Sequence, residues 1–244
     1  MFDLVSTAEL TASAAIVVFF ISSMLSSTVR QRVLIAAALT FWFCLVLTAG
    51  ATGALAHSIG PVPGVGVAVL IPLALLTLLV LGTTRGREGV RRIPIAALVG
   101  VQGLRVLGIT FVLLYWAKRL PAPFAPVAGW GDVSVGLLAI PLAVLLARST
   151  GATPKGIVVM WNVLGVADLV TAVALGATSA AGPLQLFHGQ PGTAIMTSLP
   201  WVLIPCFLVP SFLFLHLCTF YRLRTAEEQE KGLRAGLAGV EAVI

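Results

Sequence analysis

Four ionisable side chains interrupt long apolar stretches of this chain: Arg105, Asp132, Asp168 and His216. A charged side chain at the centre of a bilayer costs roughly 2.5–3.5 kcal/mol on insertion scales, so such residues are rare there and are usually paired or functional. A guanidinium group pairs well with carboxylates, and histidine is suited to proton transfer or ligation. These residue types predict ion pairing, proton relay or ligand binding.

The spacing of the polar residues repeats in two segments, each with members at i, i+3 and i+6: Gln102, Arg105 and Gly108, and Asn162, Gly165 and Asp168. On a helix each set forms one stripe. Counted from the start of its own segment, Arg105 lies at about the same depth as Asp168, since both helices run in the same direction. We therefore predict an ion pair between Arg105 and Asp168, with Asp132 as a competing partner for Arg105.

Two interpretations of this polar cluster stay open. It is either a binding or proton-relay centre, or a clamp that holds helices together. One arginine faces two aspartates, so one carboxylate lacks a fixed counter-ion. His216 either bonds to a neighbouring helix or serves as a proton shuttle, haem ligand or metal ligand. His57 and His188 are predicted outside the membrane, so the three histidines do not form one metal site.

Several known chemistries lack their required residues. The last apolar segment, 194–221, has no lysine for a retinal Schiff base. There is no cluster of His and carboxylate ligands for zinc, and no GxSxG, P-loop or GxGxxG motif. Cys44, Cys206 and Cys218 lie in apolar runs without CxxC spacing, and we interpret them as buried thiols. No metal is predicted, and the sequence specifies neither a cofactor nor an enzyme reaction.

The elements that must position these side chains are membrane helices. The chain is 59% hydrophobic and 10% charged, against roughly 25% charged residues in soluble domains, and its mean hydropathy is +1.05. Seven apolar segments are long enough to cross a bilayer: 9–29, 33–56, 63–83, 94–117, 124–147, 156–178 and 194–221. Open strands are disfavoured in lipid. We predict an all-α, polytopic bundle of seven transmembrane helices over residues 1–221, with the lipid bilayer as its first partner.

Basic residues predict the orientation, because short cytoplasmic loops are enriched in lysine and arginine. One set of alternate loops, together with a short tail over 222–244, holds twelve of the fifteen: Arg30, Arg32, Arg85, Arg87, Arg91, Arg92, Arg148, Lys155, Arg222, Arg224, Lys231 and Arg234. The other set holds Lys118 and Arg119. The N-terminus, which lacks a basic signal-peptide region, is thus predicted outside and the C-terminus in the cytoplasm. The scattered basic residues also argue against a nucleic-acid partner.

Prolines and tryptophans give two further expectations. Pro200, Pro205 and Pro210 should kink or break the last helix, either as ordinary membrane prolines or where the helix lines a cavity. The tryptophans near the predicted boundaries should anchor the bundle at the membrane surfaces: Trp116, Trp130, Trp161 and Trp201.

The C-terminal part of the chain carries motifs that resemble a group of uncharacterised bacterial multi-pass membrane proteins. The motifs are Arg105, 120–125 (LPAPFA), 128–132 (AGWGD), Trp161-Asn162 with Gly165 and Asp168, 182–185 (GPLQ), and 203–210 (LIPCFLVP) with His216. The resemblance implies a multi-pass protein of the bacterial inner (plasma) membrane, and it implies no activity.

Three hypotheses for function follow. The first is small-molecule or proton-coupled binding or transport, in which six residues line a cavity between the fourth and seventh helices: Gln102, Arg105, Asp132, Asn162, Asp168 and His216. The second is a structural or accessory subunit whose polar stripes bind a membrane-protein partner. The third is a membrane-embedded enzyme that uses a carboxylate with a histidine.

Overall fold

A computed structural model describes residues 2–56, 58–59, 62–149 and 155–241 of the chain. Its α-helices are α1 (Phe2–Leu25), α2 (Val29–Thr52), α3 (Gly64–Leu81), α4 (Thr84–Arg92), α5 (Ile95–Gly100), α6 (Ile109–Trp116), α7 (Phe124–Arg148), α8 (Lys155–Thr178) and α9 (Val209–Glu241). Short 3₁₀ segments are η1 (Ala54–Ala56), η2 (Val101–Gly108) and η3 (Ala194–Thr197), and η4 (Ile204–Leu208) is a π-helix. Two residue pairs, β1 (Ser58–Ile59) and β2 (Val62–Pro63), form a minimal antiparallel bridge.

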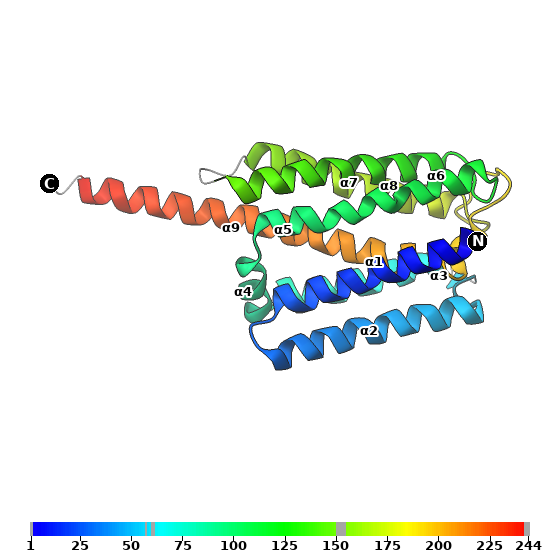
Figure 1. Ribbon diagram of the computed structural model, residues 1–244, viewed down its shortest axis with the longest axis horizontal. Helices are drawn as coiled ribbons and strands as arrows, with labels where there is room; N and C mark the ends of the chain where they lie inside the picture. Colours follow the sequence, from blue (N-terminus) through cyan, green and yellow to red (C-terminus); the bar gives the residue numbers. More distant parts are fainter. Residues whose placement is uncertain (1, 57, 60–61, 150–154, 242–244) are drawn as a thin grey trace.

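Seven helical segments within the described residues are long and apolar enough to cross a membrane. Five are single helices, while α5, η2 and α6 together make the fourth span and η4 with α9 makes the seventh. The prediction of an all-α bundle with seven spans is confirmed. The spans run roughly side by side, and the N-terminus lies at the opposite end of the bundle from the C-terminus, as an odd number of crossings requires (Figure 1).

The seventh span is the centre of the bundle. In Figure 1 α9 passes between a group formed by α5 to α8 and a group formed by α1 to α3. It packs against α3, α5 and α8, and the preceding η4 packs against α1, α2 and α3. Its buried residues, such as Phe207, Phe214 and Leu215, form the largest part of the main core. His216, on the part of α9 inside the bundle, is 0% exposed and is therefore surrounded by protein.

The fourth span is irregular because η2 interrupts it with 3₁₀ geometry. Gly100, Gly103 and Gly108 lie in or beside this segment, and glycine is a weak former of regular α-helix. The neighbouring α7 approaches η2 very closely: a Cβ placed on Gly136 of α7 would lie 2.5 Å from the backbone nitrogen of Val106. The sequence predicted an uninterrupted helix here, and the close approach of α7 explains the difference.

The seventh span begins later than predicted. Residues 194–203 form η3 and a run of turns instead of membrane helix, and the continuous helix starts at Ile204. Pro200 lies within this run, and Pro205 lies within the π-helical turn. The expected break of the helix by prolines is thus present, at its N-terminal end.

Three smaller expectations need correction. Residues 84–92, predicted as a loop, form α4, whose first turn is capped by the side chain of Thr83. Trp161 and Trp201 are 3% and 1% exposed, so they pack inside the bundle instead of anchoring it, whereas Trp116 and Trp130 are exposed. Cys44 is exposed as well, unlike the other two cysteines. His57 lies outside the described residues.

The segments that hold most basic residues gather at one end of the bundle. The start of α2, the whole of α4, the end of α7, the start of α8 and the C-terminal part of α9 lie at the end opposite the N-terminus (Figure 1). Beyond the bundle α9 stays helical to Glu241 and projects from it. Lys118 and Arg119 lie in the connection between α6 and α7, at the other end.

Candidate functional site

The 3₁₀ segment η2 aligns the polar residues of the fourth span. A 3₁₀ helix has 3.0 residues per turn, so side chains at i, i+3 and i+6 eclipse one another instead of drifting around the axis. Gln102, Arg105 and Gly108 therefore share one face of η2. That face points into the bundle, since Gln102 is 0% and Arg105 2% exposed.

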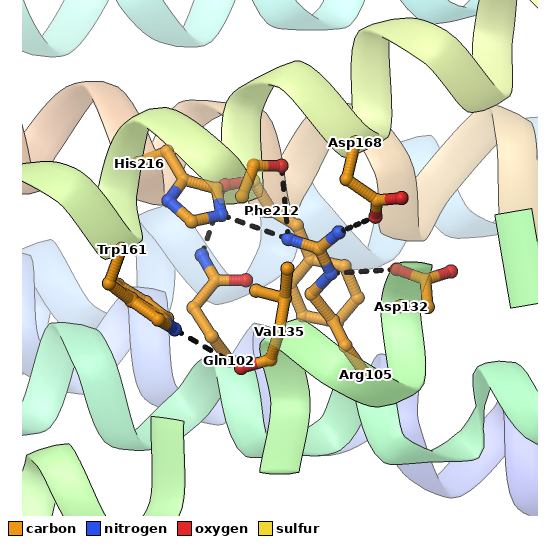
Figure 2. Close-up of polar contacts among 9 residues, drawn as sticks. Gln102, Arg105, Asp132, Val135, Trp161, Asp168, Phe212 and His216 are labelled. Atoms are coloured by element: carbon orange, nitrogen blue, oxygen red, sulfur yellow. Dashed lines mark hydrogen bonds and ion pairs between the residues drawn. The ribbon is translucent and has the colours of Figure 1, made fainter. Parts of the chain in front are cut away.

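Arg105 is held between two aspartates from two different helices. Its Nε donates to Oδ1 of Asp132 on α7 at 2.7 Å, and its Nη2 donates to Oδ2 of Asp168 on α8. The arginine side chain is fully buried, while the carboxylates are 13% and 12% exposed. The predicted pair with Asp168 is present in the structure, and the competing partner Asp132 joins it instead of replacing it (Figure 2).

The remaining guanidinium nitrogen, Nη1, contacts α8 and α9. It donates to the carbonyl oxygen of Gly165 at 3.2 Å and lies 3.0 Å from Nε2 of His216. A guanidinium group carries donors and no acceptor. Nε2 of His216 must therefore accept this hydrogen bond, which places the imidazole proton on Nδ1.

Asn162 completes that arrangement on the other side of the imidazole ring. Its Oδ1 lies 2.7 Å from Nδ1 of His216 and accepts the Nδ1 proton, while its Nδ2 donates to the carbonyl oxygen of the same histidine. The neighbouring Trp161 packs its ring 5.3 Å from the imidazole and donates to the carbonyl oxygen of Val135. His216 is thus fixed as a neutral ring by partners on both nitrogens. Figure 2 shows the contact between Arg105 and the imidazole ring.

Gln102 lies beside this network and bonds to α9 instead of to the charged groups. Its Nε2 donates to the carbonyl oxygen of Phe212 at 3.2 Å. Within the described part of the chain, its Oε1 is buried and accepts no hydrogen bond. Gln102 therefore joins η2 to α9 through its Nε2 group alone.

Glycines let the four helices come close enough for these contacts. A Cβ on Gly131 would collide with Oδ1 of Asp168, and one on Gly165 would collide with Cε1 of His216. On the other side, a Cβ on Gly108 would collide with Cβ of Asp132. The glycines that precede each aspartate therefore provide room for the neighbouring polar side chains.

Five of the six residues singled out in the sequence form one continuous network, which we call the Arg105 network: Arg105, Asp132, Asn162, Asp168 and His216. Sequence reasoning missed the role of Gly131, although this glycine lies within the segment 128–132 quoted above, and it assigned Trp161 to the membrane surface. Gly165 was already part of the polar stripe with Asn162 and Asp168. In the other half of the bundle, Glu9 of α1 accepts a hydrogen bond from Thr110 of α6 at 3.1 Å, and it too was overlooked.

The network has a defined chemical character. One guanidinium group neutralises one of two carboxylates, and a neutral imidazole continues the hydrogen-bond chain to an amide. No group of three or more His, Cys, Asp or Glu side chains suited to a metal ion occurs among the described residues. Two cavities in the described bundle, of about 380 and 500 Å³, are lined by none of the six residues singled out in the sequence. These residues therefore form a buried network instead of an open pocket.

Comparison with known proteins places this network in a family. The family described as Domain of unknown function (DUF8737) matches residues 62–224, which is more than half of the chain. The chain belongs to this family. The DUF8737 segment contains the whole Arg105 network, whereas α1 and α2 precede it. No curated protein and no solved structure was found to match the chain.

Proposed function

We propose that this protein is a proton-coupled membrane protein in which the Arg105 network binds and releases a proton as part of small-molecule binding or transport. The observation that carries the proposal is the placement of one guanidinium group between two carboxylates inside the bundle. Membrane carboxylates of this kind recur in proton pathways. The third possibility, an enzyme, is not supported by a metal site, because no group of three or more His, Cys, Asp or Glu side chains suited to a metal ion occurs among the described residues.

Charge explains why such a network would handle protons. With both aspartates ionised, the network has a net charge of −1, and one proton on either carboxylate makes it neutral. Each carboxylate uses one oxygen for the guanidinium group. Loss or gain of the proton therefore changes the electrostatic attraction between the carboxylates and Arg105. Because Asp132 lies on α7 and Asp168 on α8, this change shifts α7 relative to α8.

The proposed setting is the inner (plasma) membrane of a bacterium, with the N-terminus outside and the C-terminus in the cytoplasm. The concentration of basic segments at one end supports this orientation, since lysine and arginine are enriched on the cytoplasmic side. The Arg105 network then lies near the middle of the membrane. Its aspartates lie toward the outer side and Asn162 toward the inner side, since α8 runs outward from Lys155.

Reconstituted vesicles test the proposal. The purified protein is placed in liposomes that contain a pH-sensitive dye, and a potassium diffusion potential drives proton entry. We expect the wild type to acidify the vesicles, and Asp132→Asn and Asp168→Asn to abolish this flux. Asp3→Asn is the control, because Asp3 is an exposed carboxylate paired with Arg119 outside the network. Equal flux in the double variant Asp132→Asn, Asp168→Asn would contradict the proposal.

A second candidate function is a structural or accessory subunit of a membrane complex. The hydrogen bonds and ion pairs of Arg105 favour this function, because one side chain connects η2 to α7, α8 and α9 at once. In this case a partner protein should co-purify in stoichiometric amount from native membranes in mild detergent. A monomer that conducts protons in pure liposomes would exclude the accessory role as the sole function.

A further inference from the structure

A separate cavity of about 380 Å³ lies at the end of the bundle that holds the N-terminus. It is built by the first turns of α3, the last turns of α8, the η3 region and the π-helical turn η4. Its size is within the range of small-molecule sites, roughly 300–1,000 Å³. Because none of the six network residues lines it, it is not explained by the proton chemistry proposed above.

The deep part of the cavity is apolar. Val69 of α3, Ala172 of α8 and Val209 of α9 line it. Phe111 and Phe124 form an edge-to-face pair there, with ring centroids 5.5 Å apart. These apolar walls require an apolar ligand body, since a polar group buried against them would lose its hydrogen bonds to water.

The small residues of α8 create the space. Gly176 and Ala177 line the cavity on the side of α8, and an added Cβ at Gly176 would approach Phe124 to 3.2 Å. Larger side chains at these positions would fill the volume. The deepest residues lie five or six residues inside the helix ends, which at 1.5 Å per residue gives a depth of about 8–9 Å.

The mouth of the cavity is polar but uncharged. Gln185, Gln190, Thr193 and Thr197 lie in the connection between α8 and η4 and contribute to the lining. Gln190 is exposed, so the cavity opens toward this end of the bundle. Among the described residues that line it, none carries a charge. This polarity matches a neutral ligand with one hydrogen-bonding end, and it disfavours both carboxylates and ammonium groups.

We propose that this cavity binds a neutral, compact amphipathic molecule, with its apolar body against Phe111, Ala172 and Val209 and its hydrogen-bonding end at Gln185 and Gln190. An alcohol with a medium-length alkyl chain has this chemistry and fits the depth of the site. The site stands independently of the proton function. Its floor nevertheless lies one helical turn from the network, since Ala172 follows Asp168 by four residues on α8.

Photolabelling with a diazirine-bearing octanol tests the proposal on the full chain in liposomes. We expect saturable labelling of α8 and α9 at the cavity residues, with competition by 1-octanol and no competition by octanoate or octylammonium. Ala177→Phe should lower the saturable labelling at least about tenfold, which corresponds to about 1.4 kcal/mol of binding, because the phenyl ring occupies the space.

The matched control is Ala174→Phe, which introduces the same side chain on the same helix at an exposed position outside the lining. It should label like the wild type.

Thermal unfolding of both variants shows whether they fold, and Gln185→Leu provides a second variant that alters the mouth without filling the cavity. Non-saturable labelling spread over the lipid-facing helices, or equal labelling in Ala177→Phe and Ala174→Phe, would overturn the proposal. Saturable labelling of the cavity should persist in Asp168→Asn even if this variant loses proton flux. The labelling experiment can therefore contradict the cavity proposal without contradicting the proton proposal, and the reverse also holds.

Discussion

At the scale of single residues, Arg105 is the side chain on which the other members of the network depend. Its planar fork of donors reaches three helices at once, with contacts to Asp132, Asp168 and His216 and to the carbonyl oxygen of Gly165. Lysine offers a single charged centre and does not reproduce this fork. The arginine therefore makes a larger contribution than either aspartate alone.

Removal of Arg105 should destabilise the protein more than removal of one aspartate. Arg105→Leu leaves two carboxylates without a counter-ion, and we expect a loss of about 3–5 kcal/mol, as for a broken buried ion pair. Asp168→Asn leaves Arg105 paired with Asp132 and should cost less. Unfolding in mixed micelles, followed by circular dichroism, measures the difference.

The rescue of Arg105→Leu needs changes at both aspartates. The double variant Arg105→Leu, Asp168→Leu still leaves Asp132 unpaired, whereas Arg105→Leu, Asp132→Asn, Asp168→Asn leaves no isolated charge. We expect the triple variant to regain much of the lost stability while it conducts no protons. If Asp168→Asn alone unfolds as readily as Arg105→Leu, the two-carboxylate arrangement is wrong.

The two buried amides should respond differently to substitution. Asn162→Leu removes the acceptor of the Nδ1 proton of His216, and an unpaired buried donor costs about 1–3 kcal/mol. Gln102→Met removes one hydrogen bond but also removes an oxygen without a partner among the described residues, so its effect should stay within about 1 kcal/mol. The same unfolding assay compares them, and a larger loss in Gln102→Met would contradict the assigned bonds.

At the scale of elements, the contact between η2 and α7 depends on residues without side chains. Gly136 lies directly against the backbone of η2, because a Cβ added to it would lie only 2.5 Å from the nitrogen of Val106. Gly103, on η2 itself, has room, since the nearest atom to an added Cβ is Cγ1 of Ile140 at 3.4 Å. Alanine substitutions at these two positions therefore distinguish the effect of close packing on stability from the effect of helix propensity.

Gly136→Ala should therefore destabilise the bundle by about 1–3 kcal/mol, the usual cost of overpacking. Gly103→Ala should be neutral or slightly stabilising, because alanine favours helical backbone by up to about 1 kcal/mol. Melting temperatures of both variants in the same detergent make the comparison. Equal melting temperatures would show that α7 and η2 are less closely packed than the structure indicates.

At the scale of the whole molecule, the proposed orientation rests on the gathering of basic segments at one end (Figure 1). Green fluorescent protein joined after Ile244 should fluoresce in bacterial cells, and alkaline phosphatase at the same point should be inactive. A phosphatase inserted between α6 and α7, after Lys118, should be active. The reverse pattern would invert the proposed topology, although it would leave the seven spans unchanged.

The sequence alone determined the class of fold, because a bilayer allows only helices of a minimum length and the apolar segments have that length. It also determined which residues are costly in lipid, and hence that Arg105 needed a carboxylate partner. Helical spacing placed Gln102 with Arg105 and Asn162 with Asp168, since such spacing depends on local geometry only.

Only the tertiary structure decided how those partners combine. The inclusion of both Asp132 and Asp168 depends on the distance between α7 and α8, which Gly131 sets, and no single helix encodes that distance. The 3₁₀ geometry of η2, which brings Gln102 and Arg105 directly in line, was also not predicted from the sequence, and η2 lies against Gly136 of α7. The neutral state of His216 likewise required its neighbours from two other spans, because a proton's position is fixed by the partners that surround the ring.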